Sequence, residues 1–302
     1  MLVFSQIQGQ PRALQGLRRA IDGGKVASAY LFAGPAGVGK ATAALAFAAA
    51  LNCDVAPGQG CGTCESCEKL ASGHHPDFLR LVAEKQFIVI EQVRTLEQRL
   101  AFPPHEAKHR LVLIDGAERL NANAANALLK AVEEPRPGTH FVLVTAAIHR
   151  VMPTLISRCQ RLHFAPLPLE HVQRALERAL PEHDEESRAM AAAICEGSPG
   201  RAVALLENDG LAAAQGILDN LLAAASGERA ADVFEAAMEA GRDKAQLAQV
   251  LDLLRIRLRD LLLAQAGLDG RLTGSAAGDA IAAEAKDLGL QRIRAQLRAV
   301  QE

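Results

Sequence analysis

The chain has 302 residues, of which 49% are hydrophobic and 23% are charged, and its formal net charge is −2 at pH 7. This length and apolar content predict two or three ordered domains, each with its own core. The nearly balanced charge excludes a generally basic nucleic-acid-binding protein. The absence of Trp and the presence of a single Tyr argue against base stacking.

The sequence has no pattern typical of export or membrane insertion. Its first residues lack the charged and apolar segments of a signal peptide. The longest apolar stretch, residues 41–51, is rich in Ala and too short to span a bilayer, so we interpret it as a buried helix. We therefore expect a cytoplasmic protein without membrane contact.

Up to about residue 164 the sequence alternates short apolar runs with stretches of helical period. The runs predict strands at residues 30–33, 78–82, 111–114, 141–144 and 161–164. The stretches between them predict helices at residues 39–51, 90–100 and 122–133. Strands that alternate with helices indicate an α/β domain whose parallel sheet carries helices on both faces.

Beyond residue 170 the sequence predicts only helices. Those at residues 170–180, 186–196 and 201–206 would form a small domain, and from about residue 211 a Leu- and Ala-rich period of 3.6 predicts a helical bundle. Four glycines within residues 267–277 predict a loop. We expect domains at residues 1–165, 166–208 and 209–302.

A glycine-rich loop follows the first predicted strand and precedes a predicted helix. Residues 34–40 read Gly-Pro-Ala-Gly-Val-Gly-Lys, a pattern whose backbone N–H groups and lysine hold phosphate oxygens. The expected nucleotide ligands from this segment are Gly34, Gly37, Gly39, Lys40 and Thr42. Ala41 occupies the position of the usual magnesium-binding hydroxyl, and Thr42 lies one residue too late, about 100° around the helix. The alternative is a turn that only packs the strand against the helix.

Residues 111–115, Leu-Val-Leu-Ile-Asp, form the strand and acid that such a loop pairs with. We expect this strand to lie beside the loop, with Asp115 binding magnesium through water. Gly116 stands where a hydrolysing enzyme carries its catalytic glutamate. Glu118, three residues beyond Asp115, is interpreted as a solvated charge. The pattern predicts nucleotide binding without efficient hydrolysis.

The segment at residues 53–67 is a cysteine module with the spacing Cys-x7-Cys-x2-Cys-x2-Cys. Four thiolates form a closed, tetrahedral, structural zinc site, and the ligands would be Cys53, Cys61, Cys64 and Cys67. The Cys-Pro signature of common ferredoxin clusters is absent. Free thiols, or a ligand from His74 or His75, are the alternatives.

The order of these motifs resembles the subunits of bacterial clamp loaders, a branch of the AAA+ proteins. The motifs are Gly9-Gln10-Pro11, the glycine-rich loop, the cysteine module, His75-Pro76-Asp77, residues 111–115, the run Asn-Ala-Leu-Leu-Lys-Ala-Val-Glu-Glu-Pro at residues 126–135, and Ser157-Arg158-Cys159. The resemblance covers at least residues 4–205. The Glu-Glu-Pro run and the Ser-Arg-Cys triplet are its specific elements, whereas the glycine-rich loop alone is not specific.

The resemblance implies an α/β AAA+ core with the cysteine module, then an all-α lid and an all-α collar for oligomerisation. By position, Arg158 corresponds to the arginine finger that enters the ATP site of a neighbouring subunit. Thr145 corresponds to sensor 1 and Arg201 to sensor 2. The implied cofactors are structural Zn²⁺ and, at the glycine-rich loop, ATP or ADP that is bound without turnover.

The resemblance also implies a role in the complex. The motor subunits gamma and tau carry Lys-Thr or Lys-Ser and Asp-Glu where this sequence has Lys40-Ala41 and Asp115-Gly116. We therefore expect a non-motor subunit of the DNA polymerase III holoenzyme, a nucleotidyltransferase complex, that does no chemistry alone. Its partners would be gamma/tau and delta, and through them the sliding clamp and primed DNA. The alternatives are an active gamma/tau-type ATPase and a zinc-containing AAA+ adaptor outside replication.

Overall fold

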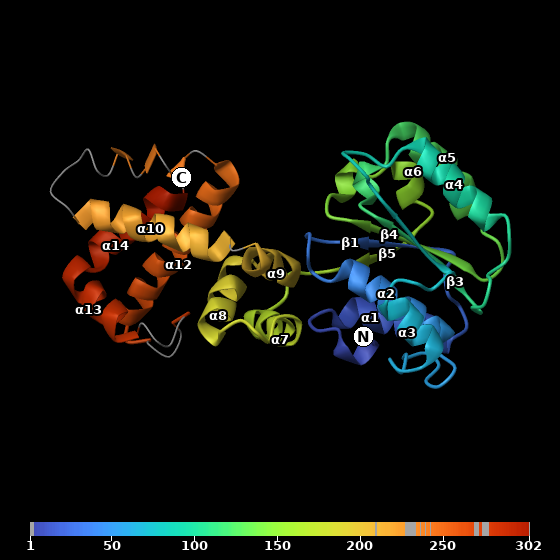
Figure 1. Ribbon diagram of the computed structural model, residues 1–302, viewed down its shortest axis with the longest axis horizontal. Helices are drawn as coiled ribbons and strands as arrows, with labels where there is room; N and C mark the ends of the chain where they lie inside the picture. The colour runs from blue at the N-terminus through green and yellow to red at the C-terminus, as the bar shows by residue number, and fades with distance from the viewer. Residues whose placement is uncertain are drawn as a thin grey trace. The chain divides into compact units, whose positions relative to one another are not determined.

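The computed structural model describes residues 3–208, 210–226, 234–235, 237–238, 240–241, 243–268, 272–273 and 278–301. The chain forms two compact units, Met1–Leu167 and Pro168–Glu302 (Figure 1). A further division of the second unit near residue 208 stays a prediction. No helix in the described ranges is both long enough and apolar enough to cross a membrane.

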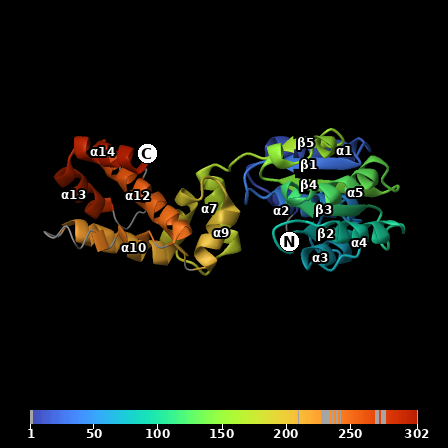
Figure 2. The same ribbon diagram turned by 90° about the horizontal axis from the view of Figure 1, so that it is seen from above.

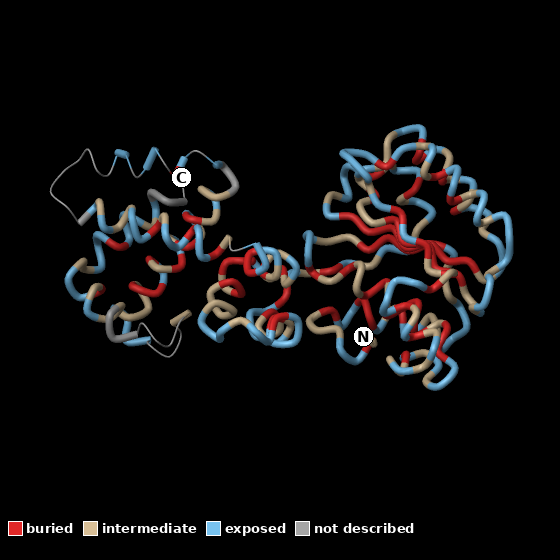
Figure 3. Tube along the Cα trace, viewed as in Figure 1, coloured by how far each residue is buried: buried red, intermediate tan, exposed pale blue. Residues whose placement is uncertain are grey.

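The first unit is built on one parallel sheet of five strands. In spatial order these are β2 (Phe78–Val82), β3 (Arg110–Asp115), β4 (Thr139–Thr145), β1 (Ala29–Ala33) and β5 (Gln160–His163) (Figure 2). All five predicted strands are therefore confirmed, with bounds shifted by no more than two residues. The central strands are apolar and almost wholly buried, as expected where helices cover both faces of a sheet (Figure 3).

Helices cover both faces of the sheet (Figure 1). One face carries α1 (Pro11–Asp22), α2 (Lys40–Asn52) and α3 (Glu65–Ala71), and the other carries α4 (Ile90–Leu100), α5 (Ala122–Glu133) and the short α6 (Pro153–Ile156). Three 3₁₀ turns, η1 (Phe4–Gln6), η2 (Ala117–Arg119) and η3 (Ile148–Arg150), complete the unit. The bounds of α4 and α5 coincide with the prediction, whereas α1 and α3 were not predicted.

Successive residues of β1 face the two cores in alternation. Leu31 packs into the core that α4, α5 and α6 share with the sheet. Tyr30 and Phe32 belong to an aromatic cluster on the other face, where the ring centroids of Tyr30 and Phe47 lie 5.4 Å apart in an edge-to-face contact. Phe47 lies on α2, whose many alanines allow this helix to be buried on nearly all sides. The buried helix predicted at residues 41–51 is thereby confirmed.

A buried ionic network fixes the start of β2 and β3. Asp77 and Arg110 are almost fully buried, and Arg110 donates to Asp77 over 3.1 Å. The carboxylate of Asp77 also accepts backbone N–H groups from residues 105, 106 and 107 over 2.8–2.9 Å. These bonds, led by those from the backbone, outweigh the cost of burial and hold the pKa of Asp77 below its ordinary value. The motif His75-Pro76-Asp77 therefore has a structural role in the fold.

The described part of the second unit is all helical. The helices α7 (Leu169–Ala179), α8 (Glu185–Ile194) and α9 (Pro199–Glu207) pack against one another. The long α12 (Lys244–Gln265) packs against α10 (Gly210–Ser226), α13 (Gly278–Leu288) and α14 (Leu290–Gln301). Leu258, Leu261, Ala285 and Ile293 form the centre of this bundle. Residues 269–271 and 274–277 of the predicted loop lie outside the described residues.

Two neighbouring histidines, whose rings are tilted by 40°, link the amino-terminal ends of two strands. His109 Nδ1 lies 3.0 Å from His140 Nε2, and His140 Nδ1 lies 2.9 Å from the carbonyl oxygen of Ala27. Burial lowers the pKa of both imidazoles. The charges of His140 and Lys108 lower the pKa of His109 further, whereas the hydrogen bond to Ala27 offsets part of the shift at His140. The folded chain therefore favours the neutral pair.

We expect acid to destabilise the first unit through this pair. Because the folded-state pKa values lie below the ordinary 6.5, the unfolded chain binds protons first, and the free energy of unfolding falls as the pH drops below about 6.5. The His109→Asn variant, which keeps a donor or acceptor near the position of Nδ1, should lose less stability between neutral pH and about pH 5. Urea unfolding at both pH values measures the difference, with the exposed His149→Asn as the matched control. Parallel losses in wild type and His109→Asn would contradict the prediction.

Candidate nucleotide site and cysteine cluster

The glycine-rich loop lies at the carboxyl edge of the sheet, between β1 and α2. A Cβ atom on Gly34 would lie 2.0 Å from the carbonyl oxygen of Phe164, so the loop can pass β5 only with glycine there. Gly37 and Gly39 have φ values of +72° and +92°, which other residues rarely adopt. Gly39 then caps α2, whose first N–H groups lack acceptors within the helix.

The side chain of Lys40 lies inside the loop. Its residue is only 5% exposed, and Nζ donates to the carbonyl oxygen of Gly34 over 2.7 Å and to that of Pro35. Burial lowers the pKa of Lys40, and the nearby charges of Glu118 and Asp115 offset part of that shift. Thr42 lies in the first turn of α2, one position beyond Ala41, as the sequence predicts.

The strand order corrects one expectation. Asp115 ends β3, but β3 does not lie beside the strand that leads into the loop, because β4 separates β3 from β1. Thr145, at the end of β4, pairs with Ala33, and its carbonyl oxygen accepts the N–H of Gly34 over 3.2 Å. Thr145 is fully buried and its hydroxyl accepts the N–H of Ala147. The edge thus presents the loop, Thr145 and Asp115 in that order.

Asp115 has a partner that the sequence analysis missed. Arg80, on the edge strand β2, donates from Nη2 to Asp115 Oδ2 over 2.6 Å. Val82 pairs with Asp115 in the register of the two strands, so Arg80 is the diagonal neighbour on the same face. The signal in the sequence is one arginine within an otherwise apolar strand, but only the strand pairing assigns it to Asp115.

Two further residues define what this edge can do. Gly116 has a left-handed φ of +91°, so a glutamate side chain there would require a strained backbone. Glu118 was interpreted as a solvated charge; the residue is half-buried, and its Oε2 is buried and, within the described ranges, has no hydrogen-bond partner. The residue lies on η2, directly after the β3 turn, which keeps it close to Lys40.

Arg158 lies at the opposite edge of the sheet. It follows α6 and precedes β5, whose first residue pairs with Tyr30 near the start of β1. The guanidinium forms an ion pair with Glu133 at the end of α5, and Nη1 donates to the carbonyl oxygen of Thr154 over 2.8 Å. Since strand β1 spans about 16 Å, Arg158 cannot reach the glycine-rich loop of its own chain.

Arg201 is held within the second unit. Its Nη2 donates to Asp252 on α12 over 2.8 Å, and Nη1 lies 3.4 Å from Glu196. Both carboxylates belong to the same unit as Arg201, so its charge is matched there.

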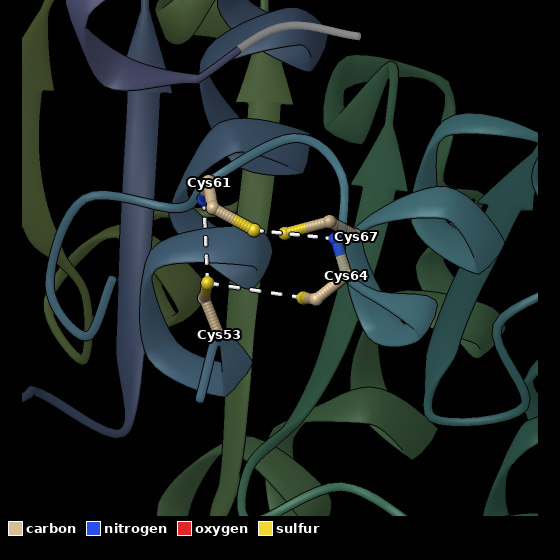
Figure 4. A group of neighbouring side chains, drawn as sticks. All are labelled: Cys53, Cys61, Cys64 and Cys67. Atoms are coloured by element: carbon tan, nitrogen blue, oxygen red, sulfur yellow. Dashed lines mark hydrogen bonds between the residues drawn. The ribbon is translucent and has the colours of Figure 1, made fainter. Parts of the chain in front are cut away.

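The four cysteines of the module converge on one point (Figure 4). Cys53 caps α2, Cys67 lies on α3, and Cys61 and Cys64 lie on the connecting loop; all four sulfurs lie within 4.8 Å of one another. Four zinc–sulfur bonds of about 2.3 Å in a tetrahedron place sulfurs about 3.8 Å apart, and the Sγ atoms of Cys53 and Cys64 are 3.8 Å apart. The cluster can therefore hold a metal ion.

Local hydrogen bonds stabilise the thiolate form of Cys61, which is the form that binds a cation. Backbone N–H groups of Thr63 and Cys64 donate to Cys61 Sγ, and bonds from Thr63 lower the pKa of this thiol to about 6. Burial raises the pKa of Cys67 to about 12, so this thiolate needs a positive charge beside it. The alternative ligand His75 is excluded, because Ser66 and the N–H of Asp77 bind its two nitrogens.

The sheet order, the loop after β1 and the acid after β3 define a P-loop protein of the AAA+ type. More narrowly, the chain belongs to the family described as "DNA polymerase III, delta subunit", whose model matches residues 9–168. The chain is similar both to delta' subunits and to tau subunits of DNA polymerase III. The resemblance to clamp-loader subunits is therefore confirmed.

Three relatives illustrate this similarity. DNA polymerase III subunit delta' of Bacillus subtilis is 32% identical over 87% of this chain and 80% of its own length. Subunit delta' of Pseudomonas aeruginosa is 39% identical over 57% of this chain and 54% of its own length. Subunit tau of Escherichia coli is 29% identical over 80% of this chain. The chain spans only 39% of that tau subunit.

Loss of one cysteine tests the metal cluster. We expect Cys64→Ser to bind less metal and to lower the unfolding midpoint of the first unit by roughly 5 °C or more, because a metal bound only to the folded chain stabilises it. Metal content per chain and thermal unfolding with and without a chelator measure both effects. In the variant, the chelator should cause little further change, which serves as the internal control. Equal midpoints of the wild type with and without chelator would contradict a structural metal.

Proposed function

We propose that the chain is the non-motor, delta-prime-type subunit of a DNA polymerase III clamp loader. In this role it acts as a stator that supports ATP-dependent loading of the sliding clamp onto primed DNA. The observation that carries the proposal is Gly116: its left-handed backbone follows Asp115 where the resemblance places the catalytic glutamate of motor subunits. The loop would hold ATP or ADP without turnover.

The absence of a general base at Gly116 is the main argument against hydrolysis. A nucleoside triphosphatase needs a group that orients or deprotonates the attacking water. Glycine has no side chain to do so, and Glu118 lies three residues beyond Asp115 on a separate turn. Ala41 also lacks the hydroxyl that would position Mg²⁺ beside the phosphates. An active gamma/tau-type motor is the alternative that these residues disfavour.

The proposed contribution to chemistry is made in trans by Arg158. Its place at the amino edge of the sheet supports this role, because it faces away from the chain's own glycine-rich loop. A guanidinium that contacts the γ-phosphate of a neighbour would stabilise the transition-state charge, an effect of about 10³–10⁵-fold in related systems. The neighbour would be a gamma/tau subunit.

Glu133 would hold Arg158 until that neighbour is present. The side chains of Arg158 and Glu133 are 37% and 41% exposed, so solvent weakens their ion pair to about 0–1 kcal/mol. A phosphate group offers the guanidinium a bidentate partner of higher charge. Exchange of Glu133 for the neighbour's phosphate would therefore cost little. Before that exchange, the ion pair with Glu133 would hold the arginine in a defined orientation.

The remaining assignments follow from the same role. The helices α10, α12, α13 and α14 would form the collar that joins delta and gamma/tau, and DNA contact would be shared with those subunits. Thr145 and Arg201 would keep sensor positions, although Arg201 is already paired with Asp252. We also propose that the protein works in the cytoplasm, where it would act on the chromosome.

For the cysteine cluster we propose zinc as the resident metal. Four thiolates without an open coordination position are the donor set of structural zinc sites. The ion would join the end of α2 to α3 and would play no part in catalysis. The fixed module then supports the carboxyl end of the helix that begins at the glycine-rich loop.

Removal of the finger tests the role of the chain. We expect Arg158→Ala to leave folding and assembly intact and to reduce turnover about 10³–10⁵-fold at the one site that it serves, which lowers the ATPase rate of the complex by that site's share. Steady-state ATPase of a reconstituted complex with gamma/tau and delta measures the loss. Arg136→Ala, which removes the same charge from the same edge of the sheet, is the matched control.

The isolated chain tests the alternative of an active motor. It should show no steady-state turnover of ATP. Turnover that Lys40→Ala abolishes would establish the motor alternative, and an unchanged ATPase rate in the complex with Arg158→Ala would reject the finger assignment.

A further inference from the structure

The site at the carboxyl edge does not fit the magnesium ion that P-loop proteins use. In such sites the ion is held by a hydroxyl after the loop lysine and by the acid that ends the neighbouring motif. Ala41 supplies no oxygen, and the Asp115 carboxylate forms an ion pair with Arg80 at 2.6 Å. A divalent cation at Asp115 would have to displace the guanidinium of Arg80, and it would find no hydroxyl ligand at position 41 to compensate.

The buried positive charge of Lys40 nevertheless favours an anionic ligand at the same site. Lys40 is 95% buried, as only 5% of it is exposed, and the carboxylates of Glu118 and Asp115 act on its charge without an ion pair to its ammonium group among the described residues. Hydrogen bonds to Gly34 and Pro35 use two of the three N–H donors of its ammonium group. A buried cation with a donor to spare, at the start of a 13-residue helix, is matched by phosphate oxygens.

We propose that the glycine-rich loop binds a nucleoside di- or triphosphate without a divalent metal ion. The phosphate charge is met by Lys40, by the backbone N–H groups of the loop and by the amino terminus of α2. Arg80 takes the place of the metal at Asp115. This inference rests on the proposed function, in which the loop holds a nucleotide without turnover, and it adds the form in which that nucleotide binds.

The geometry also explains why the bound nucleotide would persist. Hydrolysis in P-loop enzymes needs the metal ion as well as an oriented water molecule. The loop keeps the groups that bind phosphate, whereas Ala41, Arg80 and Gly116 replace the groups that activate it. A nucleotide held in this way is a structural ligand of the first unit.

Equilibrium binding of ADP and ATP to the purified full chain tests the inference. Titrations are made in excess Mg²⁺ and in excess EDTA, each monitored by calorimetry. The wild type should bind more tightly without Mg²⁺ than with it, because Mg²⁺ in solution complexes the nucleotide and lowers the concentration of the metal-free form that the site takes. Lys40→Ala should lose binding in both. Because zinc removal by EDTA would also unfold the module, a second metal-free series uses buffer without Mg²⁺ and without chelator.

Restoring the missing groups gives the sharper test. The double variant Ala41→Thr with Arg80→Met regains a hydroxyl ligand and frees Asp115, so Mg²⁺ should tighten its ADP or ATP binding about tenfold or more. Ala41→Thr with Arg94→Met is the matched control, because Arg94 is an exposed arginine on α4. Thermal unfolding confirms that each variant is folded.

Each outcome decides the question. Nucleotide binding by the wild type that Mg²⁺ tightens overturns the inference, and so does the absence of nucleotide binding in every buffer. Binding of pyrophosphate as tight as that of ADP overturns the nucleoside part. None of these results concerns Arg158 or the ATPase of the complex, so the proposed stator role would stand or fall on its own experiment.

Discussion

The parallel pairing of all five strands is the constraint on which the first unit depends. Parallel strands place every carboxyl end on one edge and every amino end on the other, and each return needs a crossover that covers a face. The glycine-rich loop, Thr145 and Asp115 therefore share one edge, although they lie far apart in the sequence. The same constraint sends Arg158 to the other edge. One sheet thus separates the proposed phosphate site from the arginine that we propose to serve a neighbour.

Two buried contacts keep these edges in place. At the carboxyl edge, the backbone of Gly34 passes the carbonyl oxygen of Phe164 with no room for a side chain, which fixes β1 against β5. At the amino edge, Asp77 and Arg110 hold the loop between α4 and β3. Removing one partner of such a buried pair typically costs about 3–5 kcal/mol, because the other charge is left without a partner. These two contacts make the sheet a rigid support for surface groups that can exchange partners.

The sequence predicted what depends on local pattern. The five strands are short apolar runs between breakers, and α4 and α5 have clear apolar stripes, so their existence and bounds could be derived. Helix α1 has an apolar stripe of Leu14, Leu17 and Ile21 at helical spacing, so its signal was present in the sequence and was overlooked. Helix α3 has only seven residues within the cysteine module and is too short for a strong periodic signal. Strand order is a long-range property. Without it, the neighbour of β3 was assigned wrongly, and Arg80 could not be linked to Asp115.

The glycine-rich loop admits two interpretations, and its residues separate them. A turn that merely packs a strand against a helix explains Gly34, whose contact with Phe164 involves no ligand. It does not explain Lys40, because an ammonium group that leaves water loses hydration that two carbonyl oxygens only partly replace. An apolar side chain of similar volume would fill the same space without that loss. The lysine therefore favours a site that receives an anion, and Gly116 and Arg80 favour one in which that anion is held and not cleaved.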